Sequence, residues 1–167
     1  MDGLIEFLSG VTSNPFVYFP VLFIYSVLVA IILPIPLELA LIFVGDPTFI
    51  VATALVIGFG KMVGAWAIFY LGLRVEDNIR RWSEKYKTVK KIVEFCIRFV
   101  DKTGYYGLFI LLSIPFMTDT VPIYIYALFN KEGELMKRNY FLLTNFVAGI
   151  VRAFIFIMLW RIGIQAI

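Results

Sequence analysis

The sequence predicts an all-α, polytopic membrane protein in which two proline-broken re-entrant hairpins and spanning helices form an inverted repeat. The first observation is composition, because 61% of the 167 residues are hydrophobic and only 16% are charged. Soluble domains are about 45–50% apolar and about 25% charged, and a chain of this length cannot bury such an excess in one soluble core. The other observations are long apolar segments and the lone charges inside them. We expect one membrane domain over residues 1–167.

Apolar segments of membrane-spanning length lie at residues 16–44, 48–73, 104–129 and 140–164. A helix needs about 20 mostly apolar residues to cross a bilayer. The second and fourth segments fit simple spanning helices. The first is too long for one untilted span.

Two basic stretches, 74–103 and 130–139, separate the later segments. Cytoplasmic loops are enriched in Lys and Arg, so we expect both stretches on the cytoplasmic side of the plasma membrane. The third segment then has to enter the membrane and return, because it begins and ends on the same side.

Prolines interrupt the first and third segments near their middles: Pro34, Pro36, Pro115 and Pro122. Proline removes a helix hydrogen bond and breaks or kinks the helix. A re-entrant hairpin is allowed where protein or a water-filled cavity satisfies its backbone. We therefore predict a span over 16–33 followed by a re-entrant piece through 45–47, and a second hairpin in the third segment. Two ordinary proline-kinked helices are the alternative.

A basic amphipathic helix is predicted within residues 76–102. Its apolar residues recur at helical spacing: Ile79, Trp82, Tyr86, Val89, Val93, Cys96 and Val100. Lysines and arginines fill the other face, so the helix suits the membrane interface. A coiled-coil contact with a partner is the alternative.

Each apolar segment carries one ionisable side chain at hydrocarbon depth, namely Glu38, Lys61, Asp119 and Arg152. A charge at the bilayer centre costs at least ~2.5–3.5 kcal/mol, so such residues pair with one another or line a path for polar cargo. We interpret them as a central polar site that binds a substrate or ion. The alternative is two structural ion pairs, Glu38–Lys61 and Asp119–Arg152.

The two halves of the chain repeat one pattern. Glu38 lies four residues after Pro34, and Asp119 lies four residues after Pro115. Each carboxylate precedes an apolar helix with one cation. Inverted repeats with broken helices and ionisable groups near the midplane are typical of secondary transporters. Close helix packing is expected around Lys61, at Gly58, Gly60 and Gly64.

Several classes of function are disfavoured. The chain has no histidine and one cysteine, Cys96, so it offers no internal disulfide and no Cys/His metal site. The commonest general base is missing, and we expect no enzyme, no catalytic residue, no cofactor and no metal. A net charge of only +3 gives no case for nucleic acid.

The chain resembles the DedA family, also called VTT or SNARE-associated Golgi proteins. The resemblance covers about residues 20–163 and rests on Pro34-x-Pro36-x-Glu38, Gly60-x-x-x-Gly64, Tyr70-x-Gly72-x-Arg74 and Lys102-Thr103-Gly104. The second half departs from the family pattern Arg-Phe-x-Pro-x-x-Arg. Pro115 is present, but Leu112 and Thr118 stand where the family has arginines.

The resemblance implies two re-entrant hairpins that face each other and a transporter or flippase for anionic lipid carriers such as polyprenyl phosphates, coupled in some members to protons or sodium. It assigns the family's re-entrant acid to Glu38. Lys61 and Arg152 are the cations available to replace the absent arginines. A lipid scramblase, an exporter of small cations or drugs, and a non-transporting scaffold remain alternative functions. A second copy of the chain, in a homo-oligomer, is a further possible partner beside membrane lipids.

Overall fold

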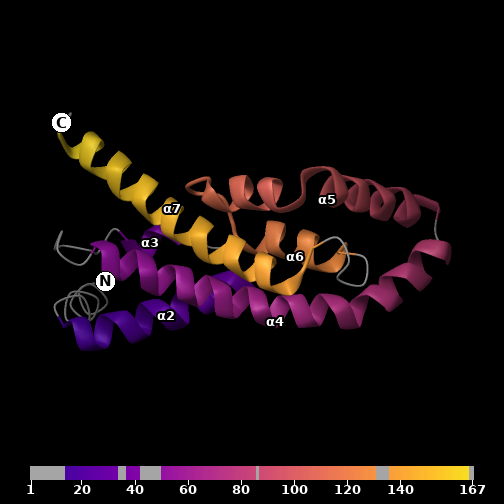
Figure 1. Ribbon diagram of the computed structural model, residues 1–167, viewed down its shortest axis with the longest axis horizontal. Coiled ribbons are helices and arrows are strands. Elements are labelled where there is room, and N and C mark those ends of the chain that lie inside the picture. Colours follow the sequence, from indigo (N-terminus) through magenta and orange to yellow (C-terminus); the bar gives the residue numbers. More distant parts are fainter. Residues whose placement is uncertain (1–13, 34–36, 42–49, 86, 131–135, 166–167) are drawn as a thin grey trace, which may run out of the picture.

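The computed structural model describes residues 14–33, 37–41, 50–85, 87–130 and 136–165, and the chain is all-helical there, with no strand. The helices, which Figure 1 labels, are α2 (Pro15–Ile31), α3 (Glu38–Leu41), α4 (Ile50–Lys85), α5 (Lys87–Ser113), α6 (Thr120–Leu128) and α7 (Arg138–Gln165). They form one elongated bundle.

Helices α4 and α7 form the antiparallel axis of the bundle. Gly58 of α4 faces Phe146 and Ile150 of α7, and farther along α4 the Phe69 ring packs on Phe141. Within these helices, Ile50–Gly72 (23 residues) and Arg138–Leu159 (22 residues) are long and apolar enough to cross a membrane. At 1.5 Å per residue each stretch is about 33–35 Å long, against a hydrocarbon core of about 30 Å.

Helix α2 packs closely along α4 in the same direction. A Cβ added at Gly60 would meet Ser26, and one added at Gly64 would meet Ala30. The two helices therefore touch through small residues on both sides, which is how membrane helices approach closely. The third glycine expected to aid packing, Gly58, serves α7 instead.

The chain turns back after α2. Since Gly64 faces Ala30, the last turn of α2 ends beyond the middle of the stretch Ile50–Gly72. Helix α3 then lies toward the end of the bundle where α4 begins (Figure 1). Pro34, Pro36 and the predicted re-entrant piece at 45–47 lie outside the described residues.

Helices α5 and α6 form a second hairpin. A kink at Gly104, whose φ of 49° favours glycine, divides α5. Pro115 lies in the turn that follows Ser113, whereas Pro122 lies in the first turn of α6, where its missing N–H leaves no helix bond unmade. Helix α6 then runs alongside α4 until Ala127 meets Gly72.

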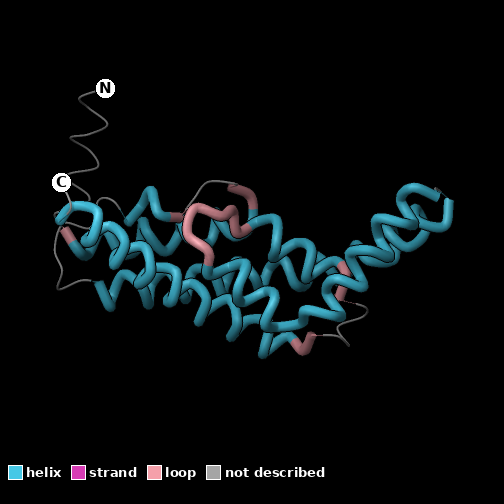
Figure 2. Tube along the Cα trace, turned by 90° about the horizontal axis from the view of Figure 1, so that it is seen from above, coloured by secondary structure: helices cyan, strands magenta, loops and turns pink. Residues whose placement is uncertain are grey.

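The expected single amphipathic helix over 76–102 is divided between two helices. Residues up to Lys85 extend α4, and Lys87 begins α5. The end of α4 and the start of α5 project from the rest of the bundle (Figures 1 and 2). The side chains of Ile79, Trp82, Tyr86 and Val89 lie outside those that the structure describes. In α5, Val93, Cys96 and Val100 are at least partly buried, whereas Lys90, Lys91 and Lys102 are exposed.

The outer surface of the bundle is largely apolar along α2, α4 and α7. Large hydrophobic side chains point outward at helical spacing from α2 and α4, at Val21, Ile24, Leu28, Val51, Leu55, Phe59 and Val63. Helix α7 adds Leu143, Val147, Phe154 and Met158. Less than half of each candidate span is buried inside the molecule. The two helices of spanning length and this exposed surface indicate a membrane protein.

The contact between α2 and α4 yields a stability prediction. A valine at Gly64 would place its Cβ 3.0 Å from the carbonyl oxygen of Val27 and still closer to Ala30. Overpacking of this kind costs about 1–3 kcal/mol, so we expect Gly64→Val to lower the melting temperature of the purified protein in detergent. Gly163→Val is the matched control, because nothing lies within 4 Å of a Cβ there. Equal melting temperatures for the two variants would contradict this packing.

Candidate functional site

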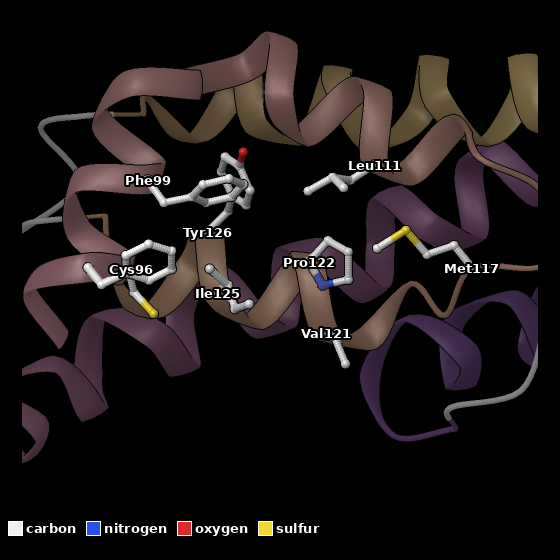
Figure 3. Close-up of a pocket in the computed structure, with 9 residues that line it drawn as sticks. Cys96, Phe99, Leu111, Met117, Val121, Pro122, Ile125 and Tyr126 are labelled. Atoms are coloured by element: carbon white, nitrogen blue, oxygen red, sulfur yellow. The ribbon is translucent and has the colours of Figure 1, made fainter. Parts of the chain in front are cut away.

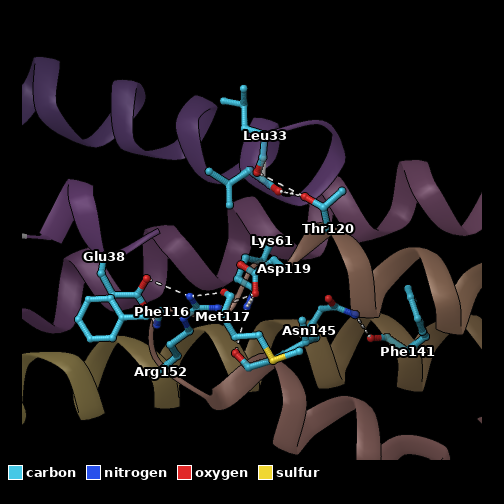
Figure 4. A network of polar contacts seen from close by, with 12 residues as sticks. Leu33, Glu38, Lys61, Phe116, Met117, Asp119, Thr120, Phe141, Asn145 and Arg152 are labelled. Carbon is cyan, nitrogen blue, oxygen red and sulfur yellow. Dashed lines mark hydrogen bonds and ion pairs between the residues drawn. The ribbon is translucent and has the colours of Figure 1, made fainter. Parts of the chain in front are cut away.

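The charged side chains of the apolar segments gather in one place. Glu38 begins α3, Lys61 lies in α4, Asp119 precedes α6 and Arg152 lies in α7 (Figure 4). None of the four residues is more than 1% exposed. Lys61 lies midway along the apolar stretch Ile50–Gly72, so the cluster sits near the middle of the bundle.

Arg152 is the centre of the cluster. Its Nε and Nη2 donate to the two carboxylate oxygens of Glu38 at 2.5 and 2.9 Å. Its Nη1 donates to Asp119 Oδ1 at 2.8 Å, and Nη2 also donates to the carbonyl oxygen of Met117 at 2.6 Å. A guanidinium has five N–H donors, so most of its hydrogen-bonding capacity is in use.

Lys61 binds the same oxygen of Asp119 as Arg152 does. Its Nζ donates to Asp119 Oδ1 at 3.0 Å and to the carbonyl oxygen of Leu112 at 3.5 Å. Gly149 of α7 leaves room for the lysine stem, since a Cβ there would lie 3.0 Å from Lys61 Cδ. One carboxylate oxygen thus accepts bonds from both cations.

The turn between α5 and α6 brings the two halves together. Phe116 has a φ of 63°, which is uncommon outside glycine, and its N–H donates to Glu38 Oε1 at 3.1 Å. Thr120 donates from its hydroxyl to the carbonyl oxygens of Val29 and Leu33 at 2.9 and 3.3 Å. The end of α2 and the start of α6 therefore meet beside the charges (Figure 4).

The observed pairing corrects the simple scheme of two separate ion pairs. Glu38 is bound by Arg152 rather than Lys61, and Asp119 is shared by Arg152 and Lys61. The spacing of charges along the chain could not reveal this, because it depends on how the two turns meet. Two acids and two bases leave the cluster neutral, which limits the cost of burying them.

Three buried side-chain oxygens near the cluster have no hydrogen-bond partner among the described residues: Asp119 Oδ2, Ser113 Oγ and Asn145 Oδ1. Ser113 follows Leu112, whose carbonyl binds Lys61. Asn145 lies one helical turn before Gly149, which contacts Lys61. Buried polar atoms are normally satisfied. Each of these oxygens can accept a further hydrogen bond, and the carboxylate oxygen of Asp119 can also accept a proton.

Sequence reasoning missed Ser113 and Asn145 because it counted only ionisable residues. A search for uncharged polar residues inside apolar segments would have found both. The Met117 carbonyl and the Phe116 N–H could not be found from the sequence, because nearly every residue type has these backbone groups.

The chemistry available at the site is limited to charge and hydrogen bonding. Among the described residues no group of three His, Cys, Asp or Glu side chains could hold a metal ion. The cluster can bind an anion through Lys61 and Arg152 if a carboxylate gives way, and it can accept a proton at a carboxylate.

Comparison with known proteins leaves the family open. No protein-family model matches the chain, and neither a characterised protein nor a solved structure is significantly similar to it.

The network predicts a charge-balance effect on stability. Arg152→Met leaves an uncompensated buried charge, which costs about 3–5 kcal/mol. The double variant Glu38→Gln/Arg152→Met keeps the Lys61–Asp119 pair, so we expect it to melt closer to wild type than Arg152→Met does. Glu94→Gln, at a half-exposed carboxylate outside the cluster, should melt like wild type. If the double variant melts below Arg152→Met, the four charges are not balanced as described.

Proposed function

We propose that this chain is a polytopic protein of the plasma membrane in which α4 and α7 cross the bilayer and two shorter hairpins enter from opposite sides. Support comes from α2, which ends beyond the middle of the α4 span, and from α6, which runs beside α4 only from Lys61 to Gly72. Each hairpin followed by a long helix makes one half of an inverted repeat. This arrangement, with the sequence motifs, favours membership of the DedA family.

The orientation follows from exposed basic residues. Lys90, Lys91, Lys137 and Arg138 are exposed and lie toward the end of the bundle where α5 and α7 begin (Figure 1). Basic residues favour the cytoplasmic side, so this end, with the loop 74–103, faces the cytoplasm in the proposal.

The proposed activity is movement of the phosphate headgroup of an anionic lipid, such as a polyprenyl phosphate, across the membrane. The observation that carries it is the buried Arg152 guanidinium, held between carboxylates from both halves. Guanidinium binds carboxylate and phosphate with the same two-pronged geometry. A phosphate can therefore take the place of Glu38 on Arg152, with Lys61 as a second cation.

Proton coupling is the proposed means of exchange. In the observed state the cluster is neutral and Arg152 is occupied, so an anion has no net charge to attract it. A proton on Asp119, whose Oδ2 is unpartnered, makes the cluster positive and weakens the hold on Arg152 and Lys61. The headgroup then binds, and loss of the proton restores the ion pairs and releases it. Proton and headgroup accordingly move in the same direction.

Reconstituted transport tests this proposal. Vesicles would contain the protein and a polyprenyl phosphate, and headgroup exposure would be followed as phosphate released by an added impermeant phosphatase. We expect faster exposure when the compartment from which headgroups leave is acidified, and loss of this gradient dependence in Glu38→Gln and Asp119→Asn. Glu94→Gln should behave as wild type. Movement that ignores the gradient would indicate a scramblase, and an absence of movement in wild type would overturn the proposal.

A static scaffold is the second candidate, because the four charges already satisfy one another as a neutral group. In that case the cluster serves stability alone, and reconstituted protein moves neither lipids nor small cations. The same assay separates the two functions, since Asp119→Asn would then alter the melting temperature without any transport to lose.

Topology is testable with single cysteines in a Cys96→Ala background. Lys90→Cys and Lys137→Cys should react with an impermeant thiol reagent from the cytoplasmic side, and Gly163→Cys only from the opposite side. These positions are exposed. Lys90 and Lys137 lie near the starts of α5 and α7, and Gly163 lies near the end of α7, toward the opposite end of the bundle (Figure 1). Labelling of Lys90→Cys and Lys137→Cys from different sides would mean that residues 104–129 cross the membrane once.

A further inference from the structure

An apolar pocket lies beneath the arch of α5, separate from the charge cluster. Its volume is about 250 Å³, and its walls include Cys96 and Phe99 from the first half of α5, Leu111 from the second half, Met117 from the turn, and Pro122 and Ile125 from α6 (Figure 3). The kink at Gly104 bends α5 over α6 and leaves this space between them.

The described walls of the pocket offer a ligand no strong hydrogen-bonding group. Tyr126 carries the one hydroxyl among the lining side chains, and it is already bonded to Thr103 Oγ1 at 2.6 Å. An apolar cavity of about 150 Å³ stays dry and binds benzene. A larger cavity with similar walls therefore favours a hydrocarbon over water or a peptide, whose backbone groups need partners.

The pocket opens toward the surroundings of the bundle. Phe95 and Val121 line it and are 66% and 53% exposed. Both side chains are apolar, whereas the first half of α5 also exposes charged side chains, Glu94 and Arg98 among them. In a membrane the rim is reached by lipid chains.

One residue that lines the pocket also takes part in the charge cluster. Met117 lines the pocket, while its carbonyl oxygen accepts the bond from Arg152 Nη2. The preceding residue, Phe116, donates its N–H to Glu38. A ligand in the pocket therefore contacts the turn whose backbone binds both Glu38 and Arg152.

We propose that this pocket binds one hydrocarbon chain of a membrane lipid. The turn between α5 and α6 separates the pocket from Arg152 and Lys61, the residues proposed to bind the phosphate. The assignment rests on the membrane placement proposed above and names the part of the cargo that this pocket holds. Chain binding is thereby linked to the charge cluster through Phe116 and Met117.

Photo-crosslinking tests the assignment in vesicles, with a phosphatidylglycerol that carries a diazirine on one acyl chain. We expect adducts on residues 95–99 and 117–126, located by mass spectrometry. Cys96→Trp fills the pocket with an indole and should lower these adducts about ten-fold, because a few excluded methylene groups account for that factor. Ile110→Trp is the matched control on α5, at an exposed apolar residue that does not line the pocket, and should crosslink as wild type.

Val121→Trp provides a second variant that blocks the rim without entering the packed interior. Adducts spread evenly over the outer helix faces, or unchanged adducts in folded Cys96→Trp and Val121→Trp, would overturn the assignment. Its failure is distinguishable from failure of the proposed transport. Headgroup movement without pocket adducts removes only the chain site, whereas pocket adducts without headgroup movement remove only the transport.

Discussion

The contact between Arg152 and the two carboxylates is the interaction on which the rest of the structure depends. Glu38 comes from the first half of the chain and Asp119 from the second, while Arg152 belongs to the last long helix. Because an unpaired buried charge costs several kcal/mol, the two halves have to meet where they do. The glycines that bring α2 and α7 against α4 make this meeting possible.

Much of the fold could be predicted from the sequence. The apolar segments and their lone charges follow from composition, and Gly60 and Gly64 indicate where α2 and α4 approach. The Asp119–Arg152 contact, one of the pairings considered from the sequence, is present. The contacts of Glu38 with Arg152 and of Lys61 with Asp119 could not be predicted, because they depend on the turn at Pro115 and on the packing of α7. The division of residues 76–102 between α4 and α5 was missed because both parts share one periodic pattern. Pro122 lies in the first turn of α6, which begins at Thr120.

The site and the pocket suggest how one protein could handle a lipid with a charged head and an apolar tail. The turn between Ser113 and Thr120 separates a neutral cluster of charges from an apolar cavity and contributes groups to both. Its backbone is held in an uncommon conformation at Phe116, as turns at functional sites often are. A ligand in the cavity and the bonds of the charge cluster therefore act on the same backbone segment.

The central claim is that a phosphate replaces a carboxylate on Arg152 when Asp119 takes up a proton. Infrared difference spectroscopy of the purified protein, with and without dodecyl phosphate, measures this directly through the carbonyl stretch of a protonated carboxylic acid. The account predicts that this band appears on binding and is absent in Asp119→Asn. Binding of dodecyl phosphate without the band, or an identical band in Asp119→Asn, would contradict it.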